Sequence, residues 1–248
     1  MPLNLLAIGR TADLAEQLGD CPDSRGDCPD FRPSENGTVP FRDAAPEGTA
    51  LRWIIHHALA AAVVSCPAGS FQPLSHAAIL TAIHRQIDIL PVRFGMILPE
   101  DRAVQTFLDS HGRALGEALD RLLGASEMGL RIELPRFIAP ADRNIIVDPA
   151  HGATPPAQYL ARRKRQYQWQ DCVCAQAQQV VEDYVQALRG LYRDWRRLAN
   201  SPFGLVRLAF LVERDCLNAF RDRLAHGPTA PVGKHCTLLG PWPPYSFM

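Results

Sequence analysis

Four of the seven cysteines form two close pairs, Cys21 with Cys28 and Cys172 with Cys174. Four thiolates could hold a zinc ion in tetrahedral geometry. Six residues separate the first pair and one residue separates the second, however, and neither spacing matches the usual zinc knuckles. A disulfide framework is also disfavoured, because the chain is long and its cysteine number is odd. We therefore expect free thiols without a metal or cofactor, and keep a zinc protein as an alternative.

Two arrangements of histidine could take part in chemistry. His56 and His57 are adjacent, so on one strand their side chains would point to opposite faces and could not chelate one ion together. At a hairpin tip they would be solvated turn residues. His84 and Asp88 are four residues apart, so on a helix the carboxylate could orient the imidazole as a general base. A contact on the helix surface explains this pair equally well, and no nucleophile is identifiable nearby.

The sequence contains no known catalytic motif. It has no Gly-rich phosphate-binding loop, no GxSxG nucleophile elbow, no HExxH zinc motif and no dinucleotide-binding fingerprint. The motif search therefore assigns no catalytic residues.

Basic residues gather in two clusters in the second half of the chain. The first is the run Arg162-Arg163-Lys164-Arg165, near the start of an expected long helix, where the macrodipole disfavours cations. A specific acidic protein partner is therefore one interpretation, and a solvated helix face is the other. The second cluster would complement the end of the same helix and consists of Arg189, Arg193, Arg196 and Arg197.

Two stretches have unusual composition. Leu90-Pro91-Val92-Arg93-Phe94-Gly95 places an arginine in an apolar strand, where a buried guanidinium would need an ionic partner. Residues 240–247 contain three prolines around Trp242, followed by Tyr245 and Phe247, so this segment should be stiff and extended. We expect it to be pinned into the core, because exposed aromatic side chains of that size promote aggregation. A presented docking strip is the alternative.

The elements of the first half alternate between strands and helices. We expect a strand at 3–8, a long acidic loop over 11–50, and a hairpin formed by 51–55 and 59–65. A helix follows at 73–88, then a strand at 89–98, a helix from Pro99 to about residue 123, and a strand at 128–134.

The second half begins with a connector over 140–156 and contains the longest periodic segment, 157–199. Apolar residues recur in it at heptad steps of three and four. They occupy positions 174, 177, 181, 184, 188, 191, 195 and 198. At 1.5 Å per residue such a helix would be about 60 Å long, so part of it should project or meet a partner. A strand at 205–212, a helix at 216–225 and a strand at 236–239 follow.

These elements predict an α+β fold of two small domains with mostly antiparallel sheets, each similar to a ferredoxin-like arrangement. The domains are expected at 1–136 and 137–248. The first half holds 12 basic and 17 acidic residues, and the second half holds 14 basic and 9 acidic residues. The zero net charge therefore arises because an acidic excess in the first half cancels a basic excess in the second. A neutral total disfavours general nucleic-acid or polybasic membrane binding. No apolar run reaches the roughly 20 residues of a membrane span.

Several segments together resemble the gas vesicle GvpF/GvpL proteins. They run in order over roughly residues 51–248, and the most specific are the 90–95 stretch and Gly240-Pro241-Trp242-Pro243-Pro244-Tyr245-Ser246-Phe247. Glu127-Met-Gly-Leu-Arg-Ile, Tyr159-Leu-Ala-Arg-Arg-Lys164 and Leu211-Val-Glu-Arg-Asp215 also fit. The acidic Cys/Pro segment at 11–50 departs from the pattern.

This resemblance implies an accessory protein that is cytoplasmic, gas vesicle-associated and not an enzyme. It also implies a C-terminal domain with a modified ferredoxin-like fold and a long helix. It implies binding to the shell protein GvpA and to other Gvp proteins during nucleation and assembly, and protection of shell subunits from aggregation. The residues expected to carry the family motif or an interaction are Pro91, Arg93, Phe94, Gly95, Tyr159, Arg162, Arg163, Arg165, Gly240, Trp242, Pro243, Pro244 and Tyr245. A ferredoxin-like ligand-sensing protein or an enzyme of unknown substrate is the alternative.

Overall fold

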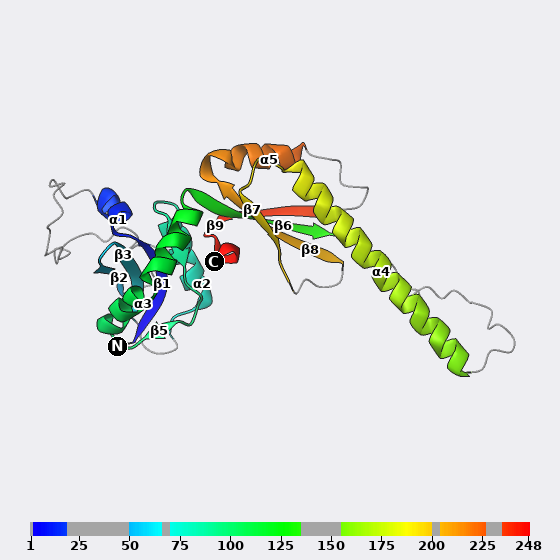
Figure 1. Cartoon of the computed structure of the whole chain (residues 1–248), viewed down its shortest axis with the longest axis horizontal. Helices are drawn as coiled ribbons and strands as arrows, with labels where there is room; N and C mark the ends of the chain where they lie inside the picture. The colour runs from blue at the N-terminus through cyan, green and yellow to red at the C-terminus, as the bar shows by residue number, and fades with distance from the viewer. Residues whose placement is uncertain (1, 19–49, 66–69, 135–154, 200–203, 227–234) are drawn as a thin grey trace. The chain divides into compact units, whose positions relative to one another are not determined.

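The computed structural model describes residues 2–18, 50–65, 70–134, 155–199, 204–226 and 235–248. The chain divides into two compact units (Figure 1). The first unit consists of Met1–Glu127 together with Trp242–Met248, and the second consists of Met128–Pro241. The domain boundary expected between residues 136 and 137 lies outside the described residues.

The first unit is built around a sheet in the order β2-β3-β1-β4, with β5 also paired to β1. Its strands are β1 (Leu3–Arg10), β2 (Ala50–His56), β3 (Leu59–Ser65), β4 (Ile89–Pro91) and β5 (Ile97–Leu98). Its helices are α1 (Thr11–Leu18), α2 (Pro73–His84) and α3 (Asp101–Leu122). The neighbouring strands of this sheet pair antiparallel, and the expected hairpin of β2 and β3 is confirmed.

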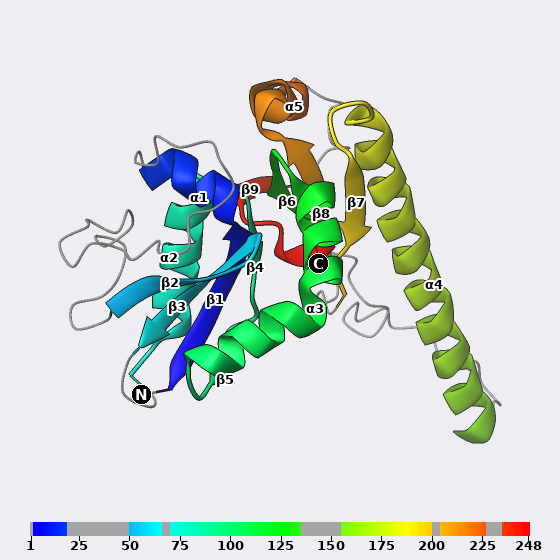
Figure 2. The same ribbon diagram turned by 60° about the vertical axis from the view of Figure 1, so that its left-hand side comes forward.

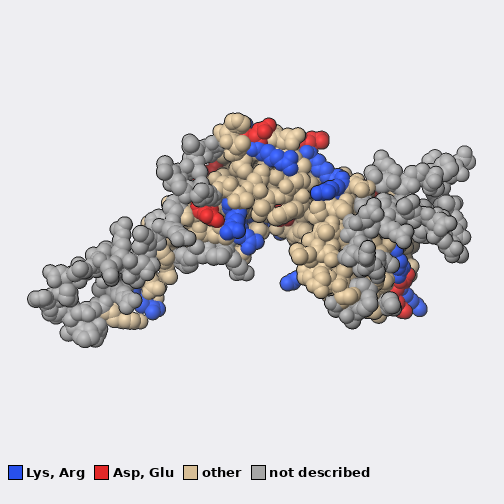
Figure 3. Space-filling model, turned by 180° about the vertical axis from the view of Figure 1, so that it is seen from behind, with Lys and Arg blue, Asp and Glu red and all other residues tan. Residues whose placement is uncertain are grey.

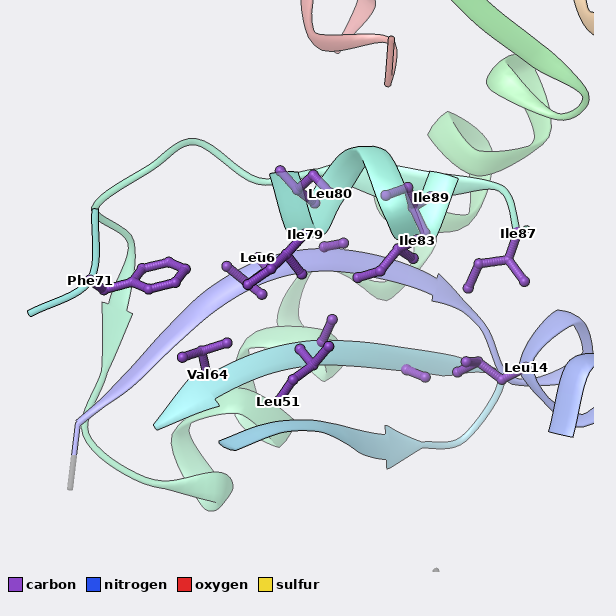
Figure 4. Packing of buried hydrophobic residues seen from close by; sticks show 13 residues of the cluster. Leu6, Leu14, Leu51, Val64, Phe71, Ile79, Leu80, Ile83, Ile87 and Ile89 are labelled. Atoms are coloured by element: carbon purple, nitrogen blue, oxygen red, sulfur yellow. The ribbon is translucent and has the colours of Figure 1, made fainter. Parts of the chain in front are cut away.

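Helices cover the two faces of this sheet, with α2 behind it and α3 in front in Figure 2. Ile79, Leu80 and Ile83 lie on one face of α2 because of their helical spacing, and all three are fully buried in the core beneath this helix. Figure 4 shows these side chains against Leu6 of β1 and Val64 of β3. On the alternate positions of β3, Ala61 and Val63 are also fully buried, as expected for a strand covered on both faces.

The expected acidic loop over 11–50 begins as a helix, which corrects that prediction. Residues 11–18 form α1, and residues 19–49 lie outside the described residues. The helix forms because Leu14, only 2% exposed, packs into the core cluster. Thr11 secures its start, since its backbone N–H donates to Ala58 O at 3.1 Å and its hydroxyl donates to His57 O at 3.0 Å.

The second unit has a four-stranded sheet in the order β7-β8-β6-β9. Its strands are β6 (Ala125–Glu133), which begins in the first unit, β7 (Asp194–Arg197), β8 (Leu205–Glu213) and β9 (His235–Trp242). Its helices are α4 (Pro155–Ala187) and α5 (Leu217–Ala225), with a 3₁₀ turn η2 (Arg214–Cys216) before α5. A second 3₁₀ turn, η3 (Tyr245–Phe247), belongs to the first unit.

Both units follow the same topology. Each has the element order strand, helix, strand, strand, helix, strand: β1-α1-β2-β3-α2-β4 in the first unit and β6-α4-β7-β8-α5-β9 in the second. Each sheet has the matching spatial order, second, third, first and fourth strand. This is the ferredoxin-like arrangement. The predicted α+β fold with antiparallel sheets is therefore confirmed, and the long α4 modifies the C-terminal copy.

The helix expected over 157–199 ends at Ala187, which corrects the second half of the heptad prediction. Leu188 still donates to Tyr184 O, but Gly190 adopts φ +84° and the chain turns. Residues 194–197 then form β7, antiparallel to β8. Trp195, expected on the helix seam, lies on this strand, and so do Arg196 and Arg197 of the second basic cluster.

Candidate functional site

The family-motif segments expected from the sequence lie in different units. The 90–95 stretch and Trp242, Pro243, Pro244 and Tyr245 belong to the first unit, whereas Gly240 and the tyrosine–arginine segment of α4 belong to the second. We describe each where it lies.

The first motif forms the end of an edge strand and a tight turn. Pro91 is the last residue of β4, an edge position that tolerates a missing N–H. Arg93, expected inside a strand with its charge buried, is exposed instead, because the strand stops after Pro91. The turn closes where Met96 N–H donates to Arg93 O at 3.4 Å, and Gly95 supplies the left-handed backbone with φ +93°.

Phe94 of this turn packs on a buried histidine. Its ring lies edge-on to His76 of α2, with centroids 5.4 Å apart, and Phe71 lies 6.2 Å from both rings. His76 is only 4% exposed, and burial lowers its pKa while a hydrogen bond to the Val92 backbone opposes the shift. An imidazole enclosed by two phenylalanine rings stays neutral near pH 7. Sequence reasoning gave His76 no role of its own; the structure places it on the buried face of α2.

The second motif is the Pro/Trp segment near the end of the chain, and from Trp242 onward it packs in the first unit. Phe247 is 1% exposed, and the prolines at 243 and 244 are buried. Ser246 donates two hydrogen bonds to Glu127, and Arg121 donates to Phe247 O at 3.5 Å. Trp242 and Tyr245 keep exposed fractions of 40% and 37%. Burial, and then the charge of Glu127, raises the pKa of Tyr245 to about 12.

The third candidate is the N-terminal part of α4. The first buried side chain among its described residues is Val173, although the helix begins at Pro155. We define the tyrosine–arginine strip as Tyr159, Arg163 and Tyr167. Arg163 Nε donates to the Tyr167 hydroxyl at 3.0 Å and Nη1 donates to the Tyr159 hydroxyl at 3.3 Å. The Arg163 guanidinium also lies 5.3 Å from the Tyr167 ring centroid, and the hydrogen bond with Tyr167 raises the pKa of Arg163.

Arg162 and Arg165 lie on the same stretch of α4, but their side chains fall outside the described residues. On the face drawn in Figure 3, basic and acidic side chains both occur over the described parts of each unit.

The residues considered for catalysis or zinc binding make contacts that suit a structural role. His84 Nε2 lies 3.0 Å from Ser126 Oγ in the core, and Asp88 accepts a hydrogen bond from the Gly124 N–H at 2.8 Å. Cys172 and Cys174 are exposed and two residues apart on α4, a spacing that does not place them on one helix face. Cys21 and Cys28 lie outside the described residues.

Comparison with known proteins identifies the class to which this fold and these motifs belong. The family model described as gas vesicle synthesis protein GvpL/GvpF matches residues 30–248, most of the chain. The chain therefore belongs to the GvpL/GvpF family of gas vesicle proteins, which confirms the resemblance found in the sequence and gives the protein a role connected with gas vesicles. No helix in the described part of the chain combines the length and apolar character needed to cross a membrane.

Individual relatives agree with this assignment. The chain is 29% identical over 244 residues to gas vesicle protein L of Streptomyces sp. (strain CB03234), covering 85% of this chain and 90% of the relative. Crystal structures of GvpF from Anabaena sp. PCC7120 and from Microcystis aeruginosa both superpose with a TM-score of 0.67. They cover 99% of this chain and 95% and 98% of their own chains, at 14% and 11% identity, and so support the fold.

Proposed function

We propose that this protein is a non-enzymatic accessory protein of gas vesicle formation that acts in the cytoplasm and at the vesicle. In this proposal it binds the shell protein GvpA and other Gvp proteins during nucleation and assembly, and it keeps shell subunits from aggregating. The observation that carries the proposal is the tyrosine–arginine strip on the exposed part of α4, in a chain whose family is that of gas vesicle proteins.

The strip has the composition and rigidity of a protein-binding surface. Tyrosine and arginine are enriched where interfaces gain most of their free energy. Tyr159 and Tyr167 are 59% and 50% exposed, and neighbouring Leu160 is 64% exposed. Arg163 already holds both tyrosines through hydrogen bonds, so a partner would order fewer rotamers on binding. The 18 residues 155–172, which come before the first buried side chain that the structure describes in this helix, offer about 27 Å of helix.

A pull-down with matched charge variants tests the surface. Arg163→Glu reverses the central charge and breaks both hydrogen bonds to tyrosine, so capture of another Gvp protein should fall by at least about tenfold. Lys164→Glu makes the same charge change one residue along the same exposed helix, about 100° around its axis, and should change capture much less. Reversing Arg162, Arg163 and Arg165 together should abolish capture. Equal losses for Arg163→Glu and Lys164→Glu would contradict a role for the strip.

The wider role is tested in cells. Deleting the gene should remove or malform gas vesicles in electron micrographs, and the unaltered gene should restore them. Complementation with Trp242→Ala should restore fewer vesicles, since this exposed side chain is available to a partner. Normal vesicles after the deletion would overturn the proposal.

One observation favours this function over the alternative of a ligand sensor or an enzyme. Burial raises the pKa of the Cys236 thiol, although a hydrogen bond with Tyr184 opposes the shift, so this thiol is a poor nucleophile.

A further inference from the structure

His56, His57 and Asp109 come together at the end of the β2–β3 hairpin. His56 Nε2 lies 2.7 Å from Asp109 Oδ1, and His57 Nε2 lies 3.8 Å from the same oxygen. The three potential ligand atoms all lie within 4.8 Å of one another. On one strand the two imidazoles would point apart, but His57 lies in the hairpin turn, as expected for a residue at the tip, and both rings reach Asp109.

The backbone of His57 explains the difference. His57 is the only non-glycine residue with positive φ, at 54°, among the described residues. This left-handed conformation ends the strand at His56 and folds the second imidazole back, so that the two ring centroids are 4.3 Å apart. Two-residue hairpin turns use a positive φ, although a non-glycine residue in this conformation is uncommon. Thr11 holds the conformation through its hydrogen bonds to the carbonyl oxygens of His57 and Ala58.

The third ligand is positioned by the packing of α3 on β2. Arg52 Nη1 donates to Asp101 Oδ2 at 2.7 Å, four residues before the His56 contact on β2 and eight residues before it on α3. Four strand residues advance about 13 Å and eight helix residues advance about 12 Å, so both elements cover nearly the same distance between the two contacts. The ion pair at the start of α3 therefore sets the register that brings Asp109 to the histidines.

We propose that His56, His57 and Asp109 form a binding site for a divalent transition-metal ion, such as Zn²⁺, Ni²⁺ or Co²⁺. Imidazole and carboxylate together suit these ions better than Mg²⁺ or Ca²⁺, which prefer oxygen ligands alone. Tetrahedral zinc with bonds of about 2.1 Å places its ligand atoms about 3.4 Å apart. The two histidine-to-aspartate separations, 2.7 Å and 3.8 Å, lie on either side of that value, and all three ligand atoms lie within 4.8 Å of one another, so side-chain adjustments would complete the site.

Three protein ligands leave at least one coordination position for water or a partner's side chain. The side chains of His57 and Asp109 are 81% and 57% exposed, so the ion could enter without unfolding. The bound ion would tie the hairpin to α3 within the first unit. This site is independent of the tyrosine–arginine strip, which lies in the second unit.

Titration of the full chain with Co²⁺ tests the proposal. We expect d–d absorption from the bound ion, whose histidine and carboxylate ligands give no sulfur-to-cobalt charge-transfer band of the kind that the exposed cysteines would produce. His57→Ala and Asp109→Asn should each weaken this binding by at least about tenfold. Both side chains are exposed, so circular dichroism should show an unchanged fold.

His111→Ala is the matched control, because His111 lies two residues from Asp109 on α3 and hydrogen-bonds Phe107 O instead. It should retain the wild-type affinity. A thermal-shift series gives a second readout: Zn²⁺ should raise Tm for the wild type and His111→Ala, and raise it less for the two ligand variants. Absence of Co²⁺ binding, or equal affinity in all four proteins, would overturn the site.

Discussion

Ser246 donates two hydrogen bonds to the buried carboxylate of Glu127, one from its backbone N–H at 2.7 Å and one from its hydroxyl at 2.8 Å. Glu127 is 5% exposed. Hydrogen bonds to a charged group are stronger than neutral ones, and a carboxylate placed in the core needs such donors. The pair therefore joins residues 119 positions apart into one structural element of the first unit.

Removing the charge of Glu127 should destabilise the first unit. Glu127→Gln replaces one acceptor oxygen by a donor that faces the Ser246 N–H or hydroxyl, so we expect a loss of about 2 kcal/mol in the free energy of unfolding. Denaturant unfolding followed by circular dichroism measures it. Glu117→Gln, which alters only the exposed pair with Arg113, should cost less than about 0.5 kcal/mol. Similar losses for the two variants would show that the Ser246 contact contributes little.

Alanine substitutions of Phe247 and Trp242 should distinguish residues of this motif that stabilise the fold from those that are available to a partner. Phe247→Ala removes a side chain that is 1% exposed and should cost about 3 to 5 kcal/mol. Trp242→Ala removes one that is 40% exposed and should cost about 1 kcal/mol. Thermal unfolding of both proteins checks the difference. If Trp242→Ala proves as destabilising as Phe247→Ala, its effect on vesicles could not be assigned to a lost partner contact.

Two glycine-to-alanine changes should act in opposite directions. Gly95→Ala places a Cβ at φ +93° in the turn after β4 and should destabilise the protein by about 1 kcal/mol, although no atom lies within 4 Å of the new Cβ. Gly112→Ala lies inside α3 with equally open space, and should stabilise by about 0.5 to 1 kcal/mol through helix propensity. Chemical denaturation of both proteins gives the two signs. A stabilising Gly95→Ala would show that the turn does not require its left-handed backbone.

His76 should make the first unit sensitive to mild acid. Burial lowers its pKa below the ordinary 6.5, so below pH 6.5 the unfolded chain binds a proton that the folded chain resists. The contribution of neutral His76 is complete above pH 6.5 and is lost as pH falls from there toward the lowered pKa. In His76→Gln, which cannot gain this proton, the fall in Tm between neutral pH and pH 5 should be smaller. An identical pH profile would place the acid-sensitive group elsewhere.

Sequence periodicity predicted those elements whose apolar spacing fits only one kind of secondary structure. The hairpin, α2, α3 and β8 formed close to their expected ranges because tertiary packing agrees with local pattern there. The helix expected to residue 199 failed because spacings of three and four continue beyond Ala187, while Gly190 turns the chain and Trp195 enters an edge strand. Local pattern could not distinguish these outcomes, because the pairing of Trp195 with Phe210 of β8 lies outside the periodic segment.

The candidate sites likewise depend on contacts that a local sequence pattern does not reveal. Pinning of the Pro/Trp segment was expected from its aromatic content. Phe247 and Ser246 do pin it, but Trp242 and Tyr245 stay 40% and 37% exposed. The pairing of Glu127 with Ser246 and of Asp109 with His56 needed the fold, because each joins segments far apart in the chain. Arg93 was placed in a strand by its apolar neighbours, whereas Gly95 makes the segment a turn.

The return of Trp242–Met248 to the first unit has a consequence for biosynthesis. The second unit, Met128–Pro241, is inserted within the sequence of the first, so the ribosome must make all of it before the first unit receives Phe247 and Ser246. Until then the burial of Phe247 and the two hydrogen bonds from Ser246 to Glu127 cannot form. The second unit, continuous in sequence, is free to fold earlier. The contacts of Trp242–Met248 with the first unit therefore form only after the second unit has been synthesised.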